Sequence, residues 1–215
     1  MPFFLATLLI PFIIGIIRIR VIHKSYYWFL FYILISVFGE LSHTFIKGIL
    51  FKNIIQNIHS IVANVALLIL LFKWGYLNNN VITKKLLIVV FILLPTINFI
   101  VQNNHEIKIQ WASLACTFIW ILLGIQYIST RLNKVNNIKI KASKILILVP
   151  LMSTIIYFTI LQILMGFLYN ASTALLFTDL YTVVIFLQIA SNLFFGIALI
   201  LAPKKENFLT LPAKA

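Results

Sequence analysis

Acidic residues are scarce in this chain of 215 residues: Asp and Glu together number four, against 17 Lys and Arg. Charged residues of both signs make up only 10% of the sequence, whereas hydrophobic residues make up 62%. Soluble domains are roughly 45–50% apolar. A water-soluble fold of this length could not bury so much apolar surface, so the composition excludes an ordinary soluble domain.

The sequence also lacks the motifs of several enzyme and receptor classes. It has one cysteine, Cys116, which cannot form an intrachain disulfide. It contains no HExxH zinc motif, P-loop, dinucleotide fingerprint or serine-hydrolase motif. Residues 178–201 contain no lysine for a retinal Schiff base and no HxxxH like that of the ceramidase and progestin-receptor group. We therefore expect no cofactor, no metal site and no catalytic residues.

Long apolar stretches recur along the whole chain. Runs of about 20 apolar residues are typical of transmembrane helices, and helices pair all of their backbone polar groups internally. The sequence predicts an all-α, polytopic membrane bundle in which residues 1–215 form a single transmembrane domain without a soluble domain. The seven predicted spans are residues 2–17, 26–46, 54–73, 84–102, 109–129, 145–168 and 178–201.

The first of these stretches is interpreted as an uncleaved span. In a secretory signal, positive charge precedes the apolar core and small residues mark a cleavage site. Here Arg18 and Arg20 follow the core, and no small-residue site comes after them.

The distribution of positive charge predicts the orientation. The net charge is +13, and the connections after the first, third and fifth spans, with the tail, hold all but three of the basic residues; the exceptions are Lys47, Lys52 and Lys108. The positive-inside rule makes the basic side cytoplasmic, with the N-terminus outside and the C-terminus inside. A basic inner face suits anionic lipid headgroups. Nucleic acid is not expected as a partner, because no basic surface is interleaved with stacking aromatics.

Polar side chains inside the spans suggest a site. In the stretch FGELSHTFIKG, Glu40 and His43 continue a stripe from Ser36 at helical spacing. An ionisable group at depth is costly and indicates function by default. We predict an outward-facing polar cavity whose ligand-binding residues are Glu40, His43, His59, Asn64 and Gln188. The alternative is that these side chains only bond neighbouring helices together.

Glu40 and His59 are expected to meet. Glu40 lies seven residues from the predicted outer end of its helix near Lys47, about 10 Å at 1.5 Å per residue, and His59 lies five residues after Ile54, about 8 Å. Since the two helices are joined by a short turn, we expect the two side chains to lie at similar depth and to share a proton.

The segment GELSHTFIKGILFKNIIQNIHSIVANVALLILLFKW resembles a group of small seven-helix integral membrane proteins of Bacteroidota-type bacteria to which no activity is assigned. The resemblance rests on an acid late in the second helix, here Glu40, followed by Asn57, Ile58 and His59 at the start of the third. It implies a second acid at position 63 or 64. This chain has Ala63 and Asn64 there, which weakens any mechanism that uses two carboxylates.

The favoured function is a sensory or accessory module in a bacterial inner membrane. The alternative is a small-solute or proton-coupled transporter, although no internal repeat or pair of broken helices is evident. An intramembrane enzyme is a third possibility. Besides the lipid bilayer, a cytoplasmic or membrane partner could bind through residues 130–144, the longest basic connection. The sequence does not define an oligomeric state.

The orientation can be tested with a reporter fused after Ala215. The predicted cytoplasmic C-terminus should support a reporter that works only in the cytoplasm. Activity of a periplasm-dependent reporter at the same position would show that the span count or the orientation is wrong.

Overall fold

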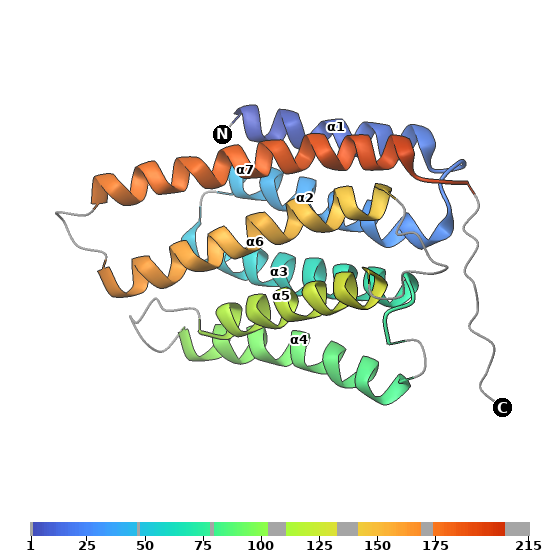
Figure 1. Ribbon diagram of the computed structural model, residues 1–215. Coiled ribbons are helices and arrows are strands. Elements are labelled where there is room, and N and C mark those ends of the chain that lie inside the picture. Colours follow the sequence, from blue (N-terminus) through green and yellow to red (C-terminus); the bar gives the residue numbers. More distant parts are fainter. Residues whose placement is uncertain are drawn as a thin grey trace.

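A computed structural model describes residues 2–46, 48–77, 80–102, 111–132, 142–168 and 174–204. These residues form seven α-helices and one 3-10 helix, without a strand. The elements in chain order are α1 (Pro2–Arg18), η1 (Lys24–Tyr26), α2 (Tyr27–Phe45), α3 (Ile49–Lys73), α4 (Val81–Gln102), α5 (Trp111–Leu132), α6 (Ala142–Leu168) and α7 (Ala174–Leu201) (Figure 1).

The all-α prediction is confirmed, since each of the seven predicted apolar segments corresponds to one helix. The largest difference lies at α3, which begins at Ile49 rather than at residue 54. The predicted apolar run started after Lys52. A helix can contain a charged residue in its first turn, so α3 begins before that run. Gly48 precedes α3 with extended backbone (φ −79°, ψ 126°), so the chain turns there before the helix starts.

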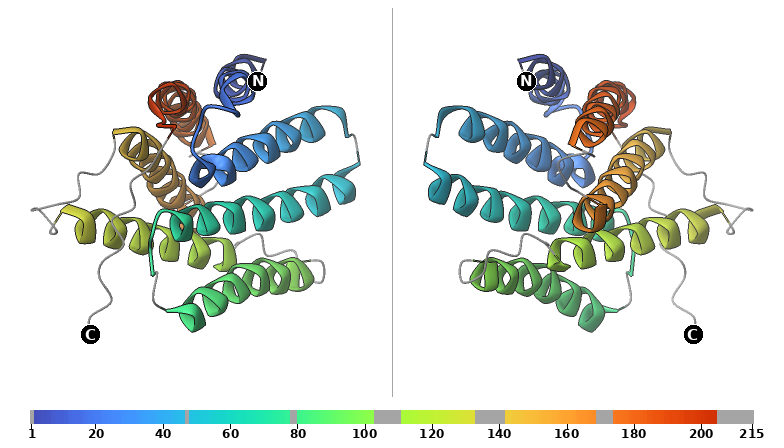
Figure 2. Two further views of the ribbon diagram at one scale, coloured as in Figure 1. Left: turned by 90° about the vertical axis from the view of Figure 1, so that its right-hand side faces the viewer. Right: turned by 90° about the vertical axis from the view of Figure 1, so that its left-hand side faces the viewer.

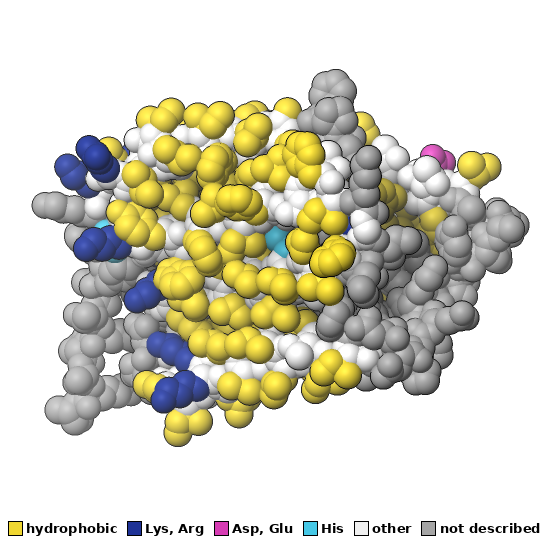
Figure 3. Space-filling model, turned by 180° about the vertical axis from the view of Figure 1, so that it is seen from behind, with side chains coloured by type: hydrophobic (Ala, Val, Ile, Leu, Met, Phe, Trp, Pro, Cys, Tyr) yellow, Lys and Arg dark blue, Asp and Glu magenta, His cyan; other side chains and the backbone are white. Residues whose placement is uncertain are grey.

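Four segments are long and apolar enough to cross a membrane: Lys24–Ser42, Ile54–Lys73, Ala142–Leu164 and Leu175–Leu201. Two shorter apolar helical segments, Leu5–Arg18 and Leu114–Thr130, accompany them. Large hydrophobic side chains cover the flanks of the helices, among them Ile17 (73% exposed) and Phe38 (61% exposed) (Figure 3). Soluble proteins rarely expose continuous apolar surface of this extent, so these features are those of a membrane protein.

The helices form a ring. Each helix packs against its neighbour in sequence, and α7 returns to pack against α1 (Figure 2). Among the described residues, helices on opposite sides of the ring do not bring their backbones together. The interior is therefore filled by side chains that reach across it, and any space that they leave lies inside the ring.

An aromatic cluster fills the ring at the end where α3 and α7 finish and α2 and α6 begin, here called the basic end. Trp74 and Tyr26 are fully buried with ring centroids 5.5 Å apart, and Trp74 also packs against Tyr127. Lys144 is only 8% exposed, and its Nζ lies 5.3 Å from the centre of the Trp74 ring. A cation over an aromatic face is stabilised by the ring quadrupole.

The end of α3 directs Tyr76 into this cluster. Gly75 has φ 90°, and the N–H groups of Gly75 and Tyr76 donate to the carbonyls of Phe72 and Leu71. This is a Schellman motif, which needs a left-handed residue after the helix and so favours glycine. Burial raises the pKa of Tyr76, so its hydroxyl stays protonated and donates to the Oε1 atom of Gln126 on α5.

Two contacts close the ring between α1 and the end of α7. The Arg18 guanidinium donates to the Leu199 carbonyl at 2.6 Å and to the Ile200 carbonyl. The His23 N–H donates to the Pro203 carbonyl at 2.9 Å. The last carbonyls of a helix have no partner within it, and a cation there also complements the helix dipole. The end of α1 therefore caps the end of α7.

Tyr26→Phe should lower the stability of the ring by about 1–2 kcal/mol, because it removes a hydrogen bond between buried groups. The Tyr26 and Ser143 hydroxyls lie 2.7 Å apart, and Ser143 is only 2% exposed. The matched control is Tyr27→Phe, since the Tyr27 hydroxyl donates to Ile19 at the exposed surface. Unfolding midpoints in SDS measure both variants. Equal midpoints would show that the buried bond does not stabilise the ring.

Candidate functional site

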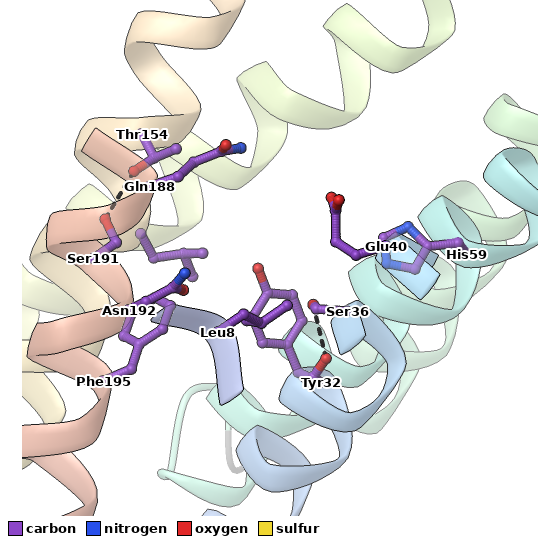
Figure 4. A pocket seen from close by; sticks show the side chains of 11 residues that line it. Leu8, Tyr32, Ser36, Glu40, His59, Thr154, Gln188, Ser191, Asn192 and Phe195 are labelled. Carbon is purple, nitrogen blue, oxygen red and sulfur yellow. Dashed lines mark hydrogen bonds between the residues drawn. The ribbon is translucent and has the colours of Figure 1, made fainter. Parts of the chain in front are cut away.

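A cavity of about 160 Å³ lies inside the ring (Figure 4). Five helices contribute to its wall, which is lined by Leu8, Tyr32, Ser36, Glu40, His59, Leu151, Thr154, Gln188, Ser191, Asn192 and Phe195. The position of the cavity along the helices follows from Gln188, which lies near the middle of the 28-residue α7, about 20 Å from either end. The cavity therefore sits at mid-height in the ring.

Helical spacing explains which residues of α2 and α7 reach the cavity. Tyr32, Ser36 and Glu40 follow one another at intervals of four along α2, so they share one face of that helix. On α7 the lining residues lie at relative positions 0, 3, 4 and 7, which again defines a single face; they are Gln188, Ser191, Asn192 and Phe195. The two faces look toward each other across the interior.

Gly39 determines how closely His59 approaches α2. A Cβ atom at position 39 would lie 2.6 Å from Cδ2 and 2.8 Å from Nε2 of the His59 ring. Contacts this short do not occur in folded proteins, so only glycine admits the imidazole at its observed place. The sequence Gly39-Glu40 thus places a notch for His59 directly beside the carboxyl group.

The Nε2 atom of His59 is buried and has no hydrogen-bond partner among the described residues. Buried polar groups are nearly always paired, and an exception points to water, an ion or a functional role. His59 also lines the cavity. His59 therefore places an imidazole beside the cavity while its Nε2 atom is packed against Gly39.

Other polar groups in the wall bond to one another. The Thr154 and Ser191 hydroxyl oxygens lie 2.9 Å apart and join α6 to α7; one hydroxyl donates to the other, which leaves the second free to donate to the carbonyl of Pro150, within 3.3 Å of both. Asn192 on α7 donates to Thr7 on α1 at 3.2 Å. Proline has no N–H group and disturbs the helix ladder around it. These bonds fix the α6–α7–α1 side of the wall.

The opposite side of the cavity is different. The Ser36 hydroxyl donates to the Tyr32 carbonyl within α2, at 2.9 Å. The Glu40 carboxyl group and the Gln188 amide project toward the space between the α2–α3 and α6–α7 sides (Figure 4). An acid, an amide and an imidazole thus approach one cavity from three helices, and such convergent polar groups can orient a small ligand.

The predicted site residues have different outcomes. Glu40, His59 and Gln188 line the same cavity. Asn64 is not among the lining residues in the described part of the chain; it donates to Ser60 one turn earlier on α3, at 3.4 Å. His43 belongs to α2, but its side chain lies outside the described residues.

His59 lies further from the start of its helix than the sequence predicted, while its depth in a membrane stays a prediction. Because α3 begins at Ile49, His59 lies ten residues, or about 15 Å, from the start of the helix. Glu40 lies five residues, or about 8 Å, from the end of α2. Both residues still line the cavity, because the His59 ring packs directly against α2 at Gly39, the residue before Glu40.

Tyr32 and Thr154 were missed as lining residues. Tyr32 continues the Ser36–Glu40 stripe by one further turn, a signal that the sequence already carried. Its aromatic side chain lies in a run that matches a lipid-facing surface equally well. Thr154 lies in an apolar helix without a polar stripe, so no sequence signal distinguished it.

Comparisons with known proteins give no match, either to a family model, to a curated protein or to a solved structure. Among the described residues, no three His, Cys, Asp or Glu side chains are grouped so that they could hold a metal ion. The resemblance to small seven-helix proteins therefore stays a prediction, and function has to be inferred from the cavity.

Gly39→Ala should destabilise the protein by about 1–3 kcal/mol, the usual cost of forcing an extra methyl group into packed structure. The new methyl group must displace His59. The control is Gly48→Ala, where the nearest atom would lie at an ordinary 3.5 Å. Thermal denaturation in detergent compares the variants. In Gly39→Ala/His59→Ala the loss should be less than additive, because the clash is removed. Strict additivity would contradict the notch.

Proposed function

We propose that this protein is a multi-pass membrane protein whose mid-height cavity binds a small solute, and that it acts as a sensory or accessory module in a bacterial inner membrane. The observation that carries the proposal is the cavity lined by Glu40, His59 and Gln188. Ionisable and amide groups inside a membrane helix are costly and mark functional sites by default.

In the proposed topology all seven helices cross the membrane. The hydrocarbon core is about 30 Å thick and needs about 20 residues of helix. Helices α4 and α5 have 22 residues each, and the 17-residue α1 packs along α7. A short α1 beside a long α7 can be accommodated by tilt or by local thinning of the bilayer.

The proposed orientation places the N-terminus outside and the basic end in the cytoplasm. The basic side chains of the described residues gather largely at one end of the ring (Figure 3). These basic residues lie at or after the last residues of α1, α3 and α7, or near the first residues of α4 and α6. Examples are Arg20, Lys73, Lys85, Lys144 and Lys204. This asymmetry supports the orientation through the positive-inside rule.

A sensory or accessory role requires an output. With no soluble domain expected, a change in the ring on solute binding would have to reach a partner protein. Residues 130–144 are the proposed docking segment on the cytoplasmic side; positions 133–141 lie outside the described residues. The docking segment starts in the last turn of α5 and ends in the first turn of α6, and α6 carries Thr154 in the cavity wall. A solute that moved α6 would therefore act directly on this segment.

A transporter is the second candidate, and one observation favours it. The cavity lies near the middle of the helices, the height at which secondary transporters bind their substrates. Glu40 and His59 could then carry protons coupled to solute movement.

Glu40→Gln tests whether the cavity is functional. Insertion and thermal stability should stay equal or improve, because the change removes a costly ionisable group while keeping its shape. Stabilisation by small solutes, screened in detergent across about pH 5–8 where histidine titrates, should be lost. His59→Gln should give a similar loss, and the double variant should be little worse than either, since coupled residues are not additive.

The control for Glu40→Gln is Asp179→Asn, which removes an exposed acid outside the cavity. It should respond to solutes as the wild type does. If Glu40→Gln keeps the wild-type response at every pH, the cavity is only a packing feature and the proposed function is wrong.

Vesicle uptake separates the two candidates. A sensory module should not accumulate any solute that stabilises the protein in the screen. Proteoliposomes loaded with a pH-sensitive dye should also show no solute-driven change of internal pH. Uptake that Glu40→Gln abolishes would instead establish the transporter.

A further inference from the structure

The basic end of the ring lies at the level where the apolar segments stop. Of the segments that are long and apolar enough to cross a membrane, Lys24–Ser42 begins at this end and Ile54–Lys73 finishes there. A third, Leu175–Leu201, finishes just before Lys204. Lipid headgroups begin where the hydrocarbon core of a bilayer ends. Cations at this end of the helices are therefore placed at the height of lipid phosphates.

Exposed basic side chains form a row across this end. Figure 3 shows them along one edge of the molecule, beside a broad apolar surface. The exposed basic residues at this end include Arg20, Lys24, Lys73, Lys85 and Lys204. Lysine and arginine extend their charged groups toward the polar edge of a membrane while their aliphatic stems cover apolar surface. This is the arrangement expected of cations that face the headgroups of one leaflet.

Acidic side chains that would neutralise this row are few. The chain holds four acids, and the sequence has none between Glu40 and Glu106. Glu40 lines the cavity at mid-height, and Asp179 lies near the start of α7, at the opposite end of the ring. Glu106 and Glu206 lie outside the described residues. In the described part of the chain, no acid therefore balances the basic end, and its field attracts an anion from outside the chain.

The turn between α3 and α4 brings three basic residues of this end together, here called the lysine cluster. Lys73 ends α3, and Lys84 and Lys85 lie at the start of α4. The Lys84 Nζ atom lies 5.6 Å from the centre of the Phe72 ring, so Lys84 extends to the residue that precedes Lys73. The attraction between an ammonium group and an aromatic face helps to hold it there. Like charges that are brought together repel one another, and a bound anion would offset that repulsion.

An apolar stripe runs along α4 from the lysine cluster. Ile82, Leu86, Val89 and Leu93 follow one another at intervals of four, three and four, which places them on one face of the helix. All four are exposed, Ile82 to 79%. Lys85 lies three residues after Ile82, on the same side of α4. The stripe is about 16 Å long, close to the depth of one leaflet, which is about 15 Å.

We propose that the lysine cluster binds the phosphate group of an anionic phospholipid whose acyl chain lies along the apolar stripe of α4. A soluble phosphate or an acidic protein segment would satisfy the lysines but would leave the stripe uncovered. A zwitterionic lipid would cover the stripe, but its own cation would offset its phosphate. An anionic lipid matches both features.

This inference goes beyond solute binding in the cavity and does not depend on it. The residues of the lysine cluster and of the stripe are not among the described residues that line the cavity. Failure of the lipid site would therefore leave the proposed solute-binding function standing, and an inert cavity would leave the lipid site standing.

A titration of the purified full-length chain in a neutral detergent tests the proposal. Thermal stabilisation is measured with phosphatidylglycerol and with phosphatidylcholine of the same acyl chains. Inorganic phosphate and polyglutamate serve as probes that carry negative charge without an acyl chain. Phosphatidylglycerol should stabilise the wild type, and the other three probes, at matched concentrations, should have a much smaller effect.

Variants locate the site. Replacing all three residues of the lysine cluster with Gln should weaken the apparent affinity for phosphatidylglycerol about tenfold or more, because several contacts between cations and an anionic headgroup are lost. The matched control is Arg20→Gln/Lys24→Gln/Lys204→Gln, which removes three charges from other parts of the same end. It should keep most of the affinity.

Four results would overturn the proposal. Stabilisation by phosphatidylcholine equal to that by phosphatidylglycerol would show that the headgroup charge is not recognised. Equal stabilisation by inorganic phosphate or polyglutamate would show a surface for a free anion or an acidic protein. Equal losses in the cluster variant and its control would show attraction by the whole basic end without a site at the turn. Absence of stabilisation by phosphatidylglycerol would exclude the site directly.

Two single variants keep the test decisive if the triple variant does not fold. Lys85→Gln should weaken the apparent affinity for phosphatidylglycerol severalfold by removing one cation. Leu86→Ser should do the same by removing apolar surface from the stripe, although it leaves the charge unchanged. Wild-type affinity in either variant would contradict the proposed contact.

Discussion

The contact between α1 and α7 is the one on which the arrangement depends. Six of the helix pairings follow from the chain itself, because consecutive helices joined by short connections pack side by side. The seventh joins helices at opposite ends of the sequence and turns a row into a ring. Arg18 on the last carbonyls of α7 and Asn192 on Thr7 fix it at two heights. Without that closure, the cavity wall would lack one side.

Ring closure also explains why the polar residues can face inward. Helices across the ring keep their backbones apart, so long side chains such as Tyr32 and Gln188 reach into the interior. The outer faces of the helices carry many exposed apolar side chains, as expected of a membrane protein, whereas polar side chains such as Ser191 and Asn192 are buried. The basic end is filled by Trp74 and its aromatic neighbours. The cavity remains where packing gives way to polar side chains at mid-height.

The length of the apolar runs predicted the helices well, because a membrane helix is long and apolar and few other stretches of this sequence are both. The predicted span at residues 54–73 coincides with the apolar segment Ile54–Lys73, but α3 itself begins earlier, at Ile49, because Lys52 interrupts the apolar run and not the helix. Helical spacing predicted the Glu40 stripe. It could not exclude Asn64, because whether a polar residue faces a cavity or bonds along its own helix depends on rotation set by neighbouring helices. Gly39 was not singled out, since its role is defined only by the His59 ring against it.

The Gly39–His59 contact links helix packing to the chemistry of the cavity. A larger residue at position 39 would push the imidazole away from α2, and Glu40 would lose its ring neighbour at the wall. The contact buries Nε2 against a surface that offers it no hydrogen bond in the described structure. A fold selected for stability alone would remove that cost by placing an apolar side chain at position 59. The unpaired nitrogen is therefore a cost that helix packing alone does not explain.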